Sequence, residues 1–167
     1  MYLKEKLESG LSPDDALAGW VGPDGADQDF VYEDGWHEIK TTGVSSSEIT
    51  ISSVEQMDCE QSGELIIMRV DKCAPAKVGS FTLYDLVHQI MNMITDCAGI
   101  TDGFVFKLGS IGYIDMTEYD QQSFIFSSRQ TYNVAGSFPR ITRRNIPTEV
   151  VNVNYTLSVP SLSPWVK

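Results

Sequence analysis

A chain of 167 residues, with 42% hydrophobic and 21% charged residues, is long enough to bury a core, which excludes a disordered chain and favours one globular domain. Its formal net charge of −11 argues against general binding of polyanions, because phosphate contacts depend on Lys and Arg. No run of about 18 apolar residues could span a bilayer and no signal peptide is recognisable, so we expect a soluble, cytoplasmic protein without a membrane partner.

Histidine and cysteine are too sparse for a zinc site. His37 and His88 are the only histidines, and Cys59, Cys73 and Cys97 are widely separated. This pattern excludes a site with several imidazoles and lacks the close cysteine pairs of zinc ligands. We expect three reduced thiols.

The first half of the chain is predicted to hold two short helices and four strands. A helix ends at Ser9-Gly10, and Ser12-Pro13 is typical of the start of the second helix. Asp34-Gly35 indicates a two-residue turn of a hairpin. The four strands are expected at residues 28–32, 36–42, 47–53 and 63–71, the last being buried, with a loop or one helical turn at 54–61.

The second half is predicted to begin with an amphipathic helix over residues 80–99, ended by Gly99. Residues 104–114 fit either a helix or a strand. Strands are expected over residues 123–134 and 149–159, on either side of the basic stretch 138–147. This order of elements predicts the mixed α/β class.

The hairpin brings acidic and basic side chains together. With Asp34-Gly35 as the turn, Asp29 lies opposite Lys40, and alternation places Asp29, Glu38 and Lys40 on one face. Two neighbouring carboxylates repel unless a cation lies between them, and hard divalent ions prefer carboxylate oxygens. A lysine beside the ion can stabilise charge on a phosphate oxygen. The pattern fits metal-dependent phosphodiester hydrolysis, while a plain hairpin with one polar face is the alternative.

Three stretches resemble a known family: "WVGPDGADQDFVYEDGWHEIKTTG", "ITISSVEQM" and "YNVAGSFPRITRRNIPTEVVNVNYTLSV". They are similar to the PD-(D/E)XK superfamily of restriction endonuclease-like nucleases, and more specifically to an uncharacterised bacterial family of PD-(D/E)XK motif proteins. The resemblance implies a restriction endonuclease-like core of helix, three strands and helix, with a strand-rich C-terminal extension. Residues 1–167 would form one nuclease-like domain, with residues 1–103 as core and 104–167 as extension.

The resemblance also implies a role for each residue of the motif. Asp29 and Glu38 would bind Mg²⁺ or Mn²⁺, and Ile39 would offer its backbone carbonyl. Lys40 would be the catalytic lysine. Gln56 matches a glutamine that some branches place near the site, although an exposed loop amide is the alternative.

The sequence departs from the motif ahead of Asp29. Its literal Pro-Asp pair is Pro23-Asp24, in a glycine-flanked turn, whereas Gln28 precedes Asp29. The alternation of side chains along the hairpin places Asp29 on the face of Glu38, which favours Asp29 over Asp24 as the ligand. Asp27 falls on the same face as Asp29 by this alternation but lies further from Glu38, and we expect it to be a solvated loop charge.

A second departure concerns the first helix. Members of the superfamily carry a further acidic residue there, and the resemblance places it just before this sequence begins. Glu5 and Glu8 are expected to be surface charges rather than substitutes. The resemblance thus implies a missing N-terminal part or weak activity.

Arg140, Arg143 and Arg144 form the one basic cluster, which would bind a DNA backbone or belong to a solvated loop. The resemblance implies a metal-dependent DNA endonuclease of bacterial restriction or phage defence, beside ATPase or helicase proteins that supply a basic surface. A catalytically silent PD-(D/E)XK fold that binds other proteins and an unrelated α/β domain are the alternatives. The sequence leaves the oligomeric state open.

Overall fold

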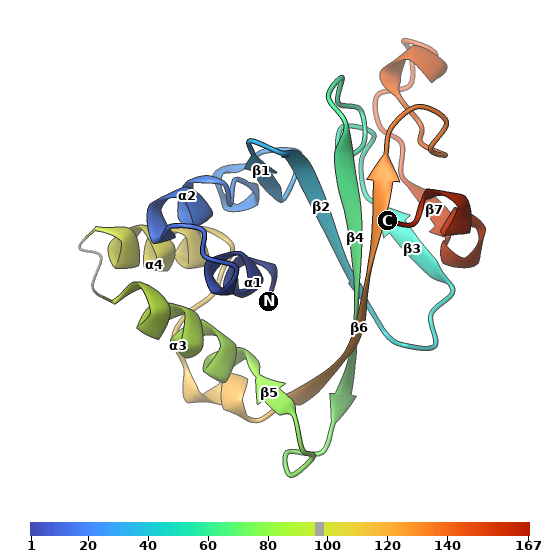
Figure 1. Cartoon of the computed structure of the whole chain (residues 1–167). Helices are drawn as coiled ribbons and strands as arrows, with labels where there is room; N and C mark the ends of the chain where they lie inside the picture. Colours follow the sequence, from blue (N-terminus) through green and yellow to red (C-terminus); the bar gives the residue numbers. More distant parts are fainter. Residues whose placement is uncertain (96–98) are drawn as a thin grey trace. The chain divides into compact units, whose positions relative to one another are not determined.

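The computed structural model describes residues 1–95 and 99–167, and the predicted thiol Cys97 lies outside them. Figure 1 shows the elements in chain order. The helices are α1 (Tyr2–Glu8), α2 (Pro13–Ala18), α3 (Leu83–Ile94) and α4 (Ile100–Ser110). The strands are β1 (Phe30–Tyr32), β2 (Gly35–Thr42), β3 (Glu48–Ile51), β4 (Gly63–Cys73), β5 (Ser80–Thr82), β6 (Ser123–Val134) and β7 (Tyr155–Ser158). The fold is mixed α/β, as predicted.

Contacts divide the chain into two compact units, residues 1–26 with 71–126 and residues 27–70 with 127–167. The first, which we call the helical unit, contains α1, α2, α3, α4 and β5 (Figure 1). The second, the strand unit, contains the hairpin and both β3 and β7. The division into a core of residues 1–103 and an extension of residues 104–167 stays a prediction.

Helix boundaries in the helical unit follow local capping. The Ser12 hydroxyl accepts the Asp15 N–H at 3.1 Å, which confirms the predicted start of α2. The third helix begins later than predicted, because Thr82 and Asp85 form a capping box and residues Ser80–Thr82 are a strand. It also ends earlier, at Ile94, and Gly99 precedes α4 instead of ending α3. No helix within the described ranges is long and apolar enough to cross a membrane.

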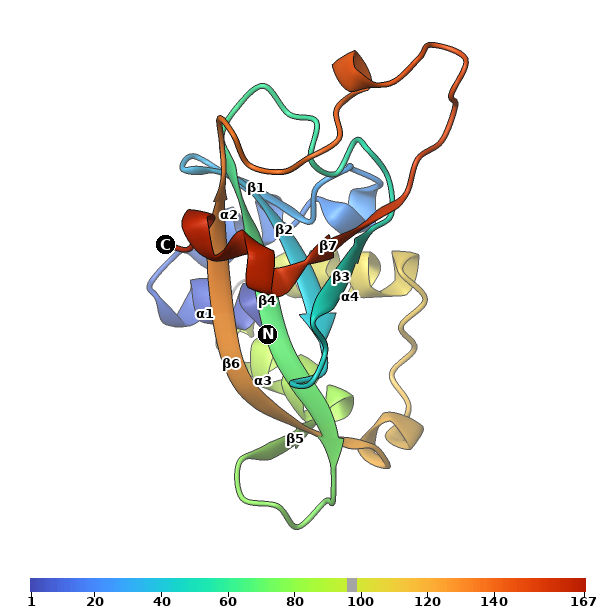
Figure 2. The same ribbon diagram turned by 90° about the vertical axis from the view of Figure 1, so that its right-hand side faces the viewer.

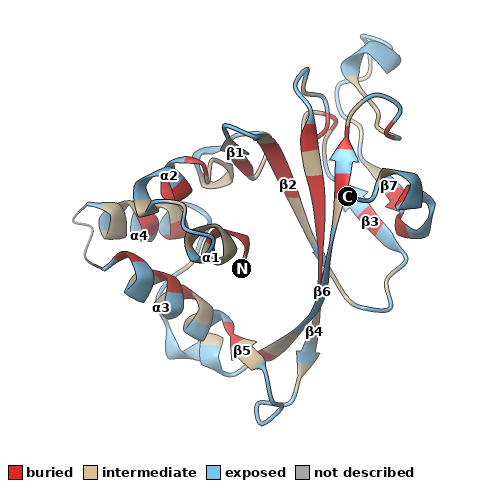
Figure 3. Cartoon of the chain, in the orientation of Figure 1, coloured by how far each residue is buried: buried red, intermediate tan, exposed pale blue. Residues whose placement is uncertain are grey.

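The strands form a mixed five-stranded sheet and a separate pair. The larger sheet has the order β1-β2-β4-β6-β5; β1 and β2 are antiparallel and β2 and β4 are parallel. The predicted buried strand, β4, is central, and Leu65, Ile66, Ile67 and Met68 are buried on it (Figure 3). Strand β3 pairs with β7 instead of continuing the hairpin sheet. Of the predicted strand 149–159, only Tyr155–Ser158 forms a β-strand.

The core of the strand unit lies between its two sheets. Figure 2 shows β3 and β7 side by side, and their antiparallel register pairs Ile49 with Leu157. These side chains belong to one buried cluster with Trp36 of β2 and Leu65 of β4. The hairpin is therefore fixed from the β3–β7 side by hydrophobic packing.

Gly63 gives Trp36 the room that it needs in this core. A Cβ at Gly63 would lie 2.1 Å from two atoms of the Trp36 ring, closer than any packed contact. Gly63→Ala is expected to lower the free energy of unfolding by about 2 kcal/mol, because the indole must shift. Gly109→Ala is the matched control, since nothing lies within 4 Å of its added Cβ in α4. Urea unfolding that finds the two variants equally stable would contradict this packing.

Candidate metal centre

The β1–β2 hairpin carries the predicted site, but its register differs from the prediction by two residues. Tyr32 pairs with Gly35, and Phe30 pairs with His37. The turn residues are therefore Glu33 and Asp34 rather than Asp34 and Gly35. A shift of two residues preserves the alternation of side chains, so Asp29 stays on the face of Glu38.

Glycine geometry explains the shifted turn. A type I′ turn on Asp34-Gly35 would need a positive φ at both residues. In the described part of the chain no residue other than glycine has a positive φ, whereas Gly35 has a φ of +129°. A Cβ there would lie 2.8 Å from the Ser62 carbonyl oxygen. Gly35 is thus required as the first residue of β2 rather than as a turn residue.

The face that holds Glu38 is buried, not solvated as in a plain hairpin with one polar face. Glu38 pairs with Leu65 of β4 and is 0% exposed, and Trp36 on the same face belongs to the core. His37 on the opposite face is buried as well, with its ring nitrogens 3.2 Å from Glu64 and 3.3 Å from Asp34. A buried carboxylate needs a compensating partner.

Lys40 and Asp29 surround the Glu38 carboxylate. The Lys40 Nζ atom lies 2.8 Å from Glu38 Oε1 and forms an ion pair with it, and both carboxylate oxygens of Glu38 are buried. Asp29 Oδ2 accepts the backbone N–H of Ile39 at 2.8 Å. The structure thus brings the two predicted ligands and the predicted lysine together around a buried carboxylate.

The pKa values of both carboxyl groups are raised. Burial and the charge of Asp29 raise the pKa of Glu38 to about 7, although Lys40 opposes the shift. Burial also raises the pKa of Asp29, against the opposing effects of the Ile39 N–H and Lys40. A divalent cation between the two groups would favour both ionised forms. The donor set therefore fits Mg²⁺ or Mn²⁺, which are bound through one or two carboxylates with water.

Gln56 lies beside Lys40, as predicted. It belongs to the turn that follows β3, in which the Met57 N–H donates to the Val54 carbonyl at 3.0 Å. Its side-chain oxygen accepts hydrogen bonds from Lys40 Nζ at 3.1 Å and from the Ser52 N–H at 2.9 Å. The amide is therefore held toward the site rather than exposed in a loop. Its role in catalysis stays a prediction.

Two of the three predicted DNA-binding arginines contact the segment that carries Gln56, residues 55–60. Arg140 Nη1 donates to the Met57 carbonyl at 2.7 Å. Arg143 Nε donates to Glu55 Oε1 at 2.7 Å, and its backbone N–H donates to Asp58 at 2.8 Å. Sequence reasoning missed this contact because more than 80 positions separate the partners, and no short-range pattern links them.

Arg144 differs from its neighbours. Its side chain is 85% exposed, and it forms an ion pair at 3.5 Å with Glu60, which is also exposed. An exposed pair of this kind contributes little to stability. A contact with DNA stays a prediction for all three arginines.

Arg143→Ala is expected to loosen segment 55–60 and the turn that orients Gln56. The backbone amides of Met57 and Asp58 should exchange with deuterium at least about tenfold faster, because local opening becomes easier. Arg144→Ala is the control, as it removes the same charge one residue further along. Equal exchange rates in the two variants would show that Arg143 does not hold the segment.

The other acidic residues lie elsewhere. Asp24 belongs to the η1 turn (Gly22–Asp24) and forms an ion pair with Lys107 in the helical unit. Asp27 is exposed and Glu8 pairs with Lys4 at 2.7 Å, in agreement with the expected surface roles. Among the residues that the structure describes, no three His, Cys, Asp or Glu side chains gather to hold a metal. Asp29 and Glu38 would therefore need backbone and water ligands as well.

A sequence model of a protein family, described as "Putative PD-(D/E)XK family member, (DUF4420)", matches residues 1–160. The chain belongs to this PD-(D/E)XK family. No curated protein and no solved structure matches it. Membership of the PD-(D/E)XK family confirms the resemblance seen in the sequence and the restriction endonuclease-like fold, and it excludes an unrelated α/β domain.

Proposed function

We propose that this PD-(D/E)XK protein is a metal-dependent endonuclease that hydrolyses phosphodiester bonds in DNA. The observation that supports the proposal most strongly is the buried Glu38 carboxylate, which lies beside the charge of Asp29 and has the Lys40 ammonium group 2.8 Å from one of its oxygens. Two neighbouring carboxylates, one of them fully buried, that share one ammonium group are unfavourable in a purely structural role. A divalent cation bound between the two carboxylates would compensate their charge.

Each residue has a separate task in this proposal. Asp29, Glu38 and the backbone carbonyl of Ile39 would hold Mg²⁺ or Mn²⁺, which supplies a Lewis acid and lowers the pKa of water. Lys40 offers a positive charge beside the carboxylates, where it can stabilise negative charge that develops on a phosphate oxygen. Gln56 accepts a hydrogen bond from Lys40 and so restricts the position of the ammonium group.

The biological setting is part of the proposal. We place the protein in bacterial restriction or phage defence, beside an ATPase or helicase. The net charge of −11 supports a partner that supplies basic surface, because the isolated chain would repel a polyanion over most of its surface.

A second candidate is a PD-(D/E)XK fold that binds proteins and lacks catalysis. It is favoured by the small number of carboxylates at the site and by the Lys40 ammonium, which already faces Glu38 at 2.8 Å. A silent site would keep this ion pair in place of a metal.

A cleavage assay separates the two candidates. Supercoiled plasmid and single-stranded DNA should be cut by the chain with Mn²⁺ or Mg²⁺ and left intact with a chelator. Asp29→Asn should lower the rate by about 100-fold or more, the scale typical of a lost electrostatic contribution. Asp27→Asn is the matched control, because Asp27 is exposed two residues earlier. Intact DNA under all metal conditions would favour the protein-binding fold.

A further inference from the structure

A cavity lies in the strand unit and shares no lining residue with the metal centre. Its volume is about 330 Å³, within the range of small-molecule sites. Ser45, Ser46 and Ser47 line it from the β2–β3 loop, and Arg69 lines it from β4. Strand β6 and the C-terminal η4 helix (Val159–Trp165) complete the wall.

Arg69 is the only charged residue in this lining. The residue is 8% exposed, and its Nη1 donates to the carbonyl oxygens of Gly43 at 2.9 Å and Ser46 at 2.6 Å. These two bonds fix the guanidinium group in the loop. They use two of the five N–H donors that an arginine carries.

These bonds use Nη1 alone, and within the described part of the chain the other three donors of Arg69, on Nε and Nη2, have no acceptor and no carboxylate within ion-pair distance. Neither nitrogen is sealed in the interior without a partner, so this edge of the guanidinium is accessible from the cavity that Arg69 lines. In a chain with a net charge of −11, a buried cation without a counter-charge is unusual and unfavourable.

The chemistry around Arg69 suits a phosphate group. Serine hydroxyls at Ser45, Ser47 and Ser163 and the amide of Gln130 line the cavity and can donate hydrogen bonds. Burial raises the pKa of Tyr132, which keeps its phenol protonated. A planar guanidinium binds two phosphate oxygens at once, and hydroxyls can bind the others.

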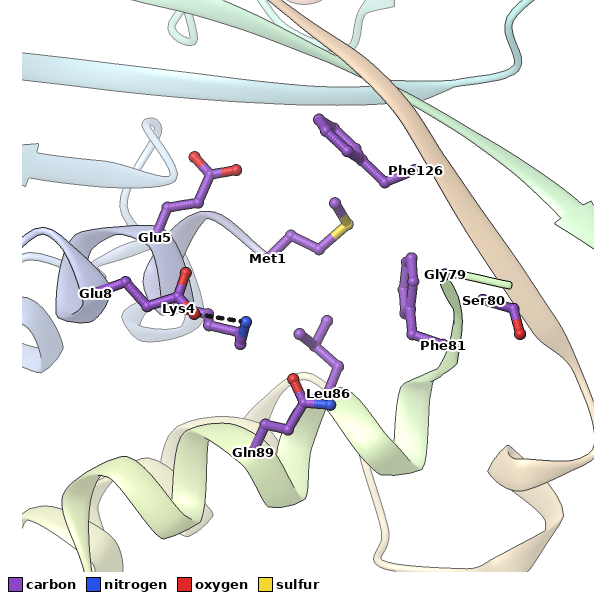
Figure 4. Close-up of a pocket in the computed structure, with 10 residues that line it drawn as sticks. All are labelled: Met1, Lys4, Glu5, Glu8, Gly79, Ser80, Phe81, Leu86, Gln89 and Phe126. Atoms are coloured by element: carbon purple, nitrogen blue, oxygen red, sulfur yellow. Dashed lines mark hydrogen bonds and ion pairs between the residues drawn. The ribbon is translucent and has the colours of Figure 1, made fainter. Parts of the chain in front are cut away.

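A comparison with another cavity shows why this charge matters. The pocket in Figure 4 lies in the helical unit, has a volume of about 350 Å³, and is lined by Lys4, Glu5 and Glu8 among others. There the Lys4 ammonium pairs with Glu8 at 2.7 Å, as the dashed line shows. Its cation is compensated within the protein, whereas Arg69 has no such partner.

We infer that the Arg69 cavity binds a phosphate group, carried by a small anion such as a nucleoside 5′-monophosphate or present as free phosphate. The inference does not depend on nuclease activity, because it uses none of the residues of the metal centre. Val159, Pro160 and Val166 give the cavity an apolar side as well, on which the base or sugar of a nucleotide can pack. This side favours the nucleotide over free phosphate.

Calorimetric titration in the presence of a chelator tests the inference without metal. The probes are inorganic phosphate and deoxyadenosine 5′-monophosphate, each added to the full chain. Gln130→Glu places a carboxylate in the lining without removing Arg69 or its loop contacts, and it should weaken binding by about tenfold or more through competition for the guanidinium. Gln121→Glu adds the same charge at an exposed position outside the cavity and should bind like the original chain.

The outcomes are distinct. Saturable binding that Gln130→Glu weakens and Gln121→Glu leaves unchanged supports the phosphate site, and the tighter of the two probes identifies the source of the phosphate. No binding of either probe, or equal weakening by both variants, overturns the inference. Retained DNA cleavage in Gln130→Glu, tested in parallel, shows that the result concerns this cavity and not the metal centre.

Discussion

Replacing Glu38 with glutamine should remove most of the loss of stability that the metal-free protein shows as the pH rises from about 5 to about 8. A carboxyl group whose pKa rises from 4.5 to about 7 on folding binds more protons in the folded state over that range. Stability therefore falls with rising pH. The rise in pKa corresponds to a loss of about 3 kcal/mol by the time Glu38 is ionised.

The net gain of Glu38→Gln at alkaline pH will be smaller than this loss, because a buried amide also lacks partners and costs about 1–3 kcal/mol. The slope of the free energy of unfolding against pH is therefore the decisive quantity. Asp29 contributes in the same direction, since its pKa is also raised by burial. Urea unfolding of the original chain and of Glu38→Gln, with a chelator at several pH values, gives the difference in their free energies of unfolding as a function of pH. Parallel curves would mean that Glu38 is already ionised at low pH in the folded protein.

Replacing Lys40 with alanine should remove DNA cleavage while metal binding persists. The ammonium group lies 2.8 Å from Glu38 and donates a hydrogen bond to Gln56. A charge in this position can act on a phosphate oxygen, and losing one such contact lowers rates by about 100- to 1,000-fold. It also competes with a cation for Glu38, so Lys40→Ala should bind Mn²⁺ at least as tightly as the original chain.

Lys77→Ala is the control for this experiment, because Lys77 is an exposed lysine of a loop in the helical unit. Cleavage rates and Mn²⁺ affinities of both variants are measured at about pH 8, where Glu38 is largely ionised in the free protein and protons compete least with the cation. A Lys40→Ala protein that cuts DNA at the original rate would remove lysine from the proposed mechanism. A loss of both cleavage and Mn²⁺ binding would give Lys40 a structural role only.

The hairpin shows what the sequence can predict about a site. Alternation of side chains placed Asp29 and Glu38 together, and this survives any error of two residues in the register. The turn itself was misplaced, because Asp34-Gly35 is a strong signal for a turn but the glycine is used at the start of β2. Which face is buried depends on β3 and β7, which lie far from the hairpin in sequence.

Long-range contacts account for the rest. The pairing of β3 with β7 joins residues about 100 positions apart, and the hydrophobic pattern of Ile49 and Ile51 does not identify the partner strand. For the same reason, the sequence did not predict that Arg140 and Arg143 contact the segment that carries Gln56. Local capping could have placed the start of α3 correctly, since Thr82 and Asp85 have the spacing of a capping box.

Calorimetric titration with Mn²⁺ at about pH 8 is the most direct test of the claim that Asp29 and Glu38 form a metal centre. We expect saturable binding by the original chain and by Asp27→Asn, and about tenfold or greater weakening in Asp29→Asn and in Glu38→Gln, because each removes one of two carboxylate ligands. Equal Mn²⁺ affinity in all four proteins, or no binding by any of them, would contradict the claim.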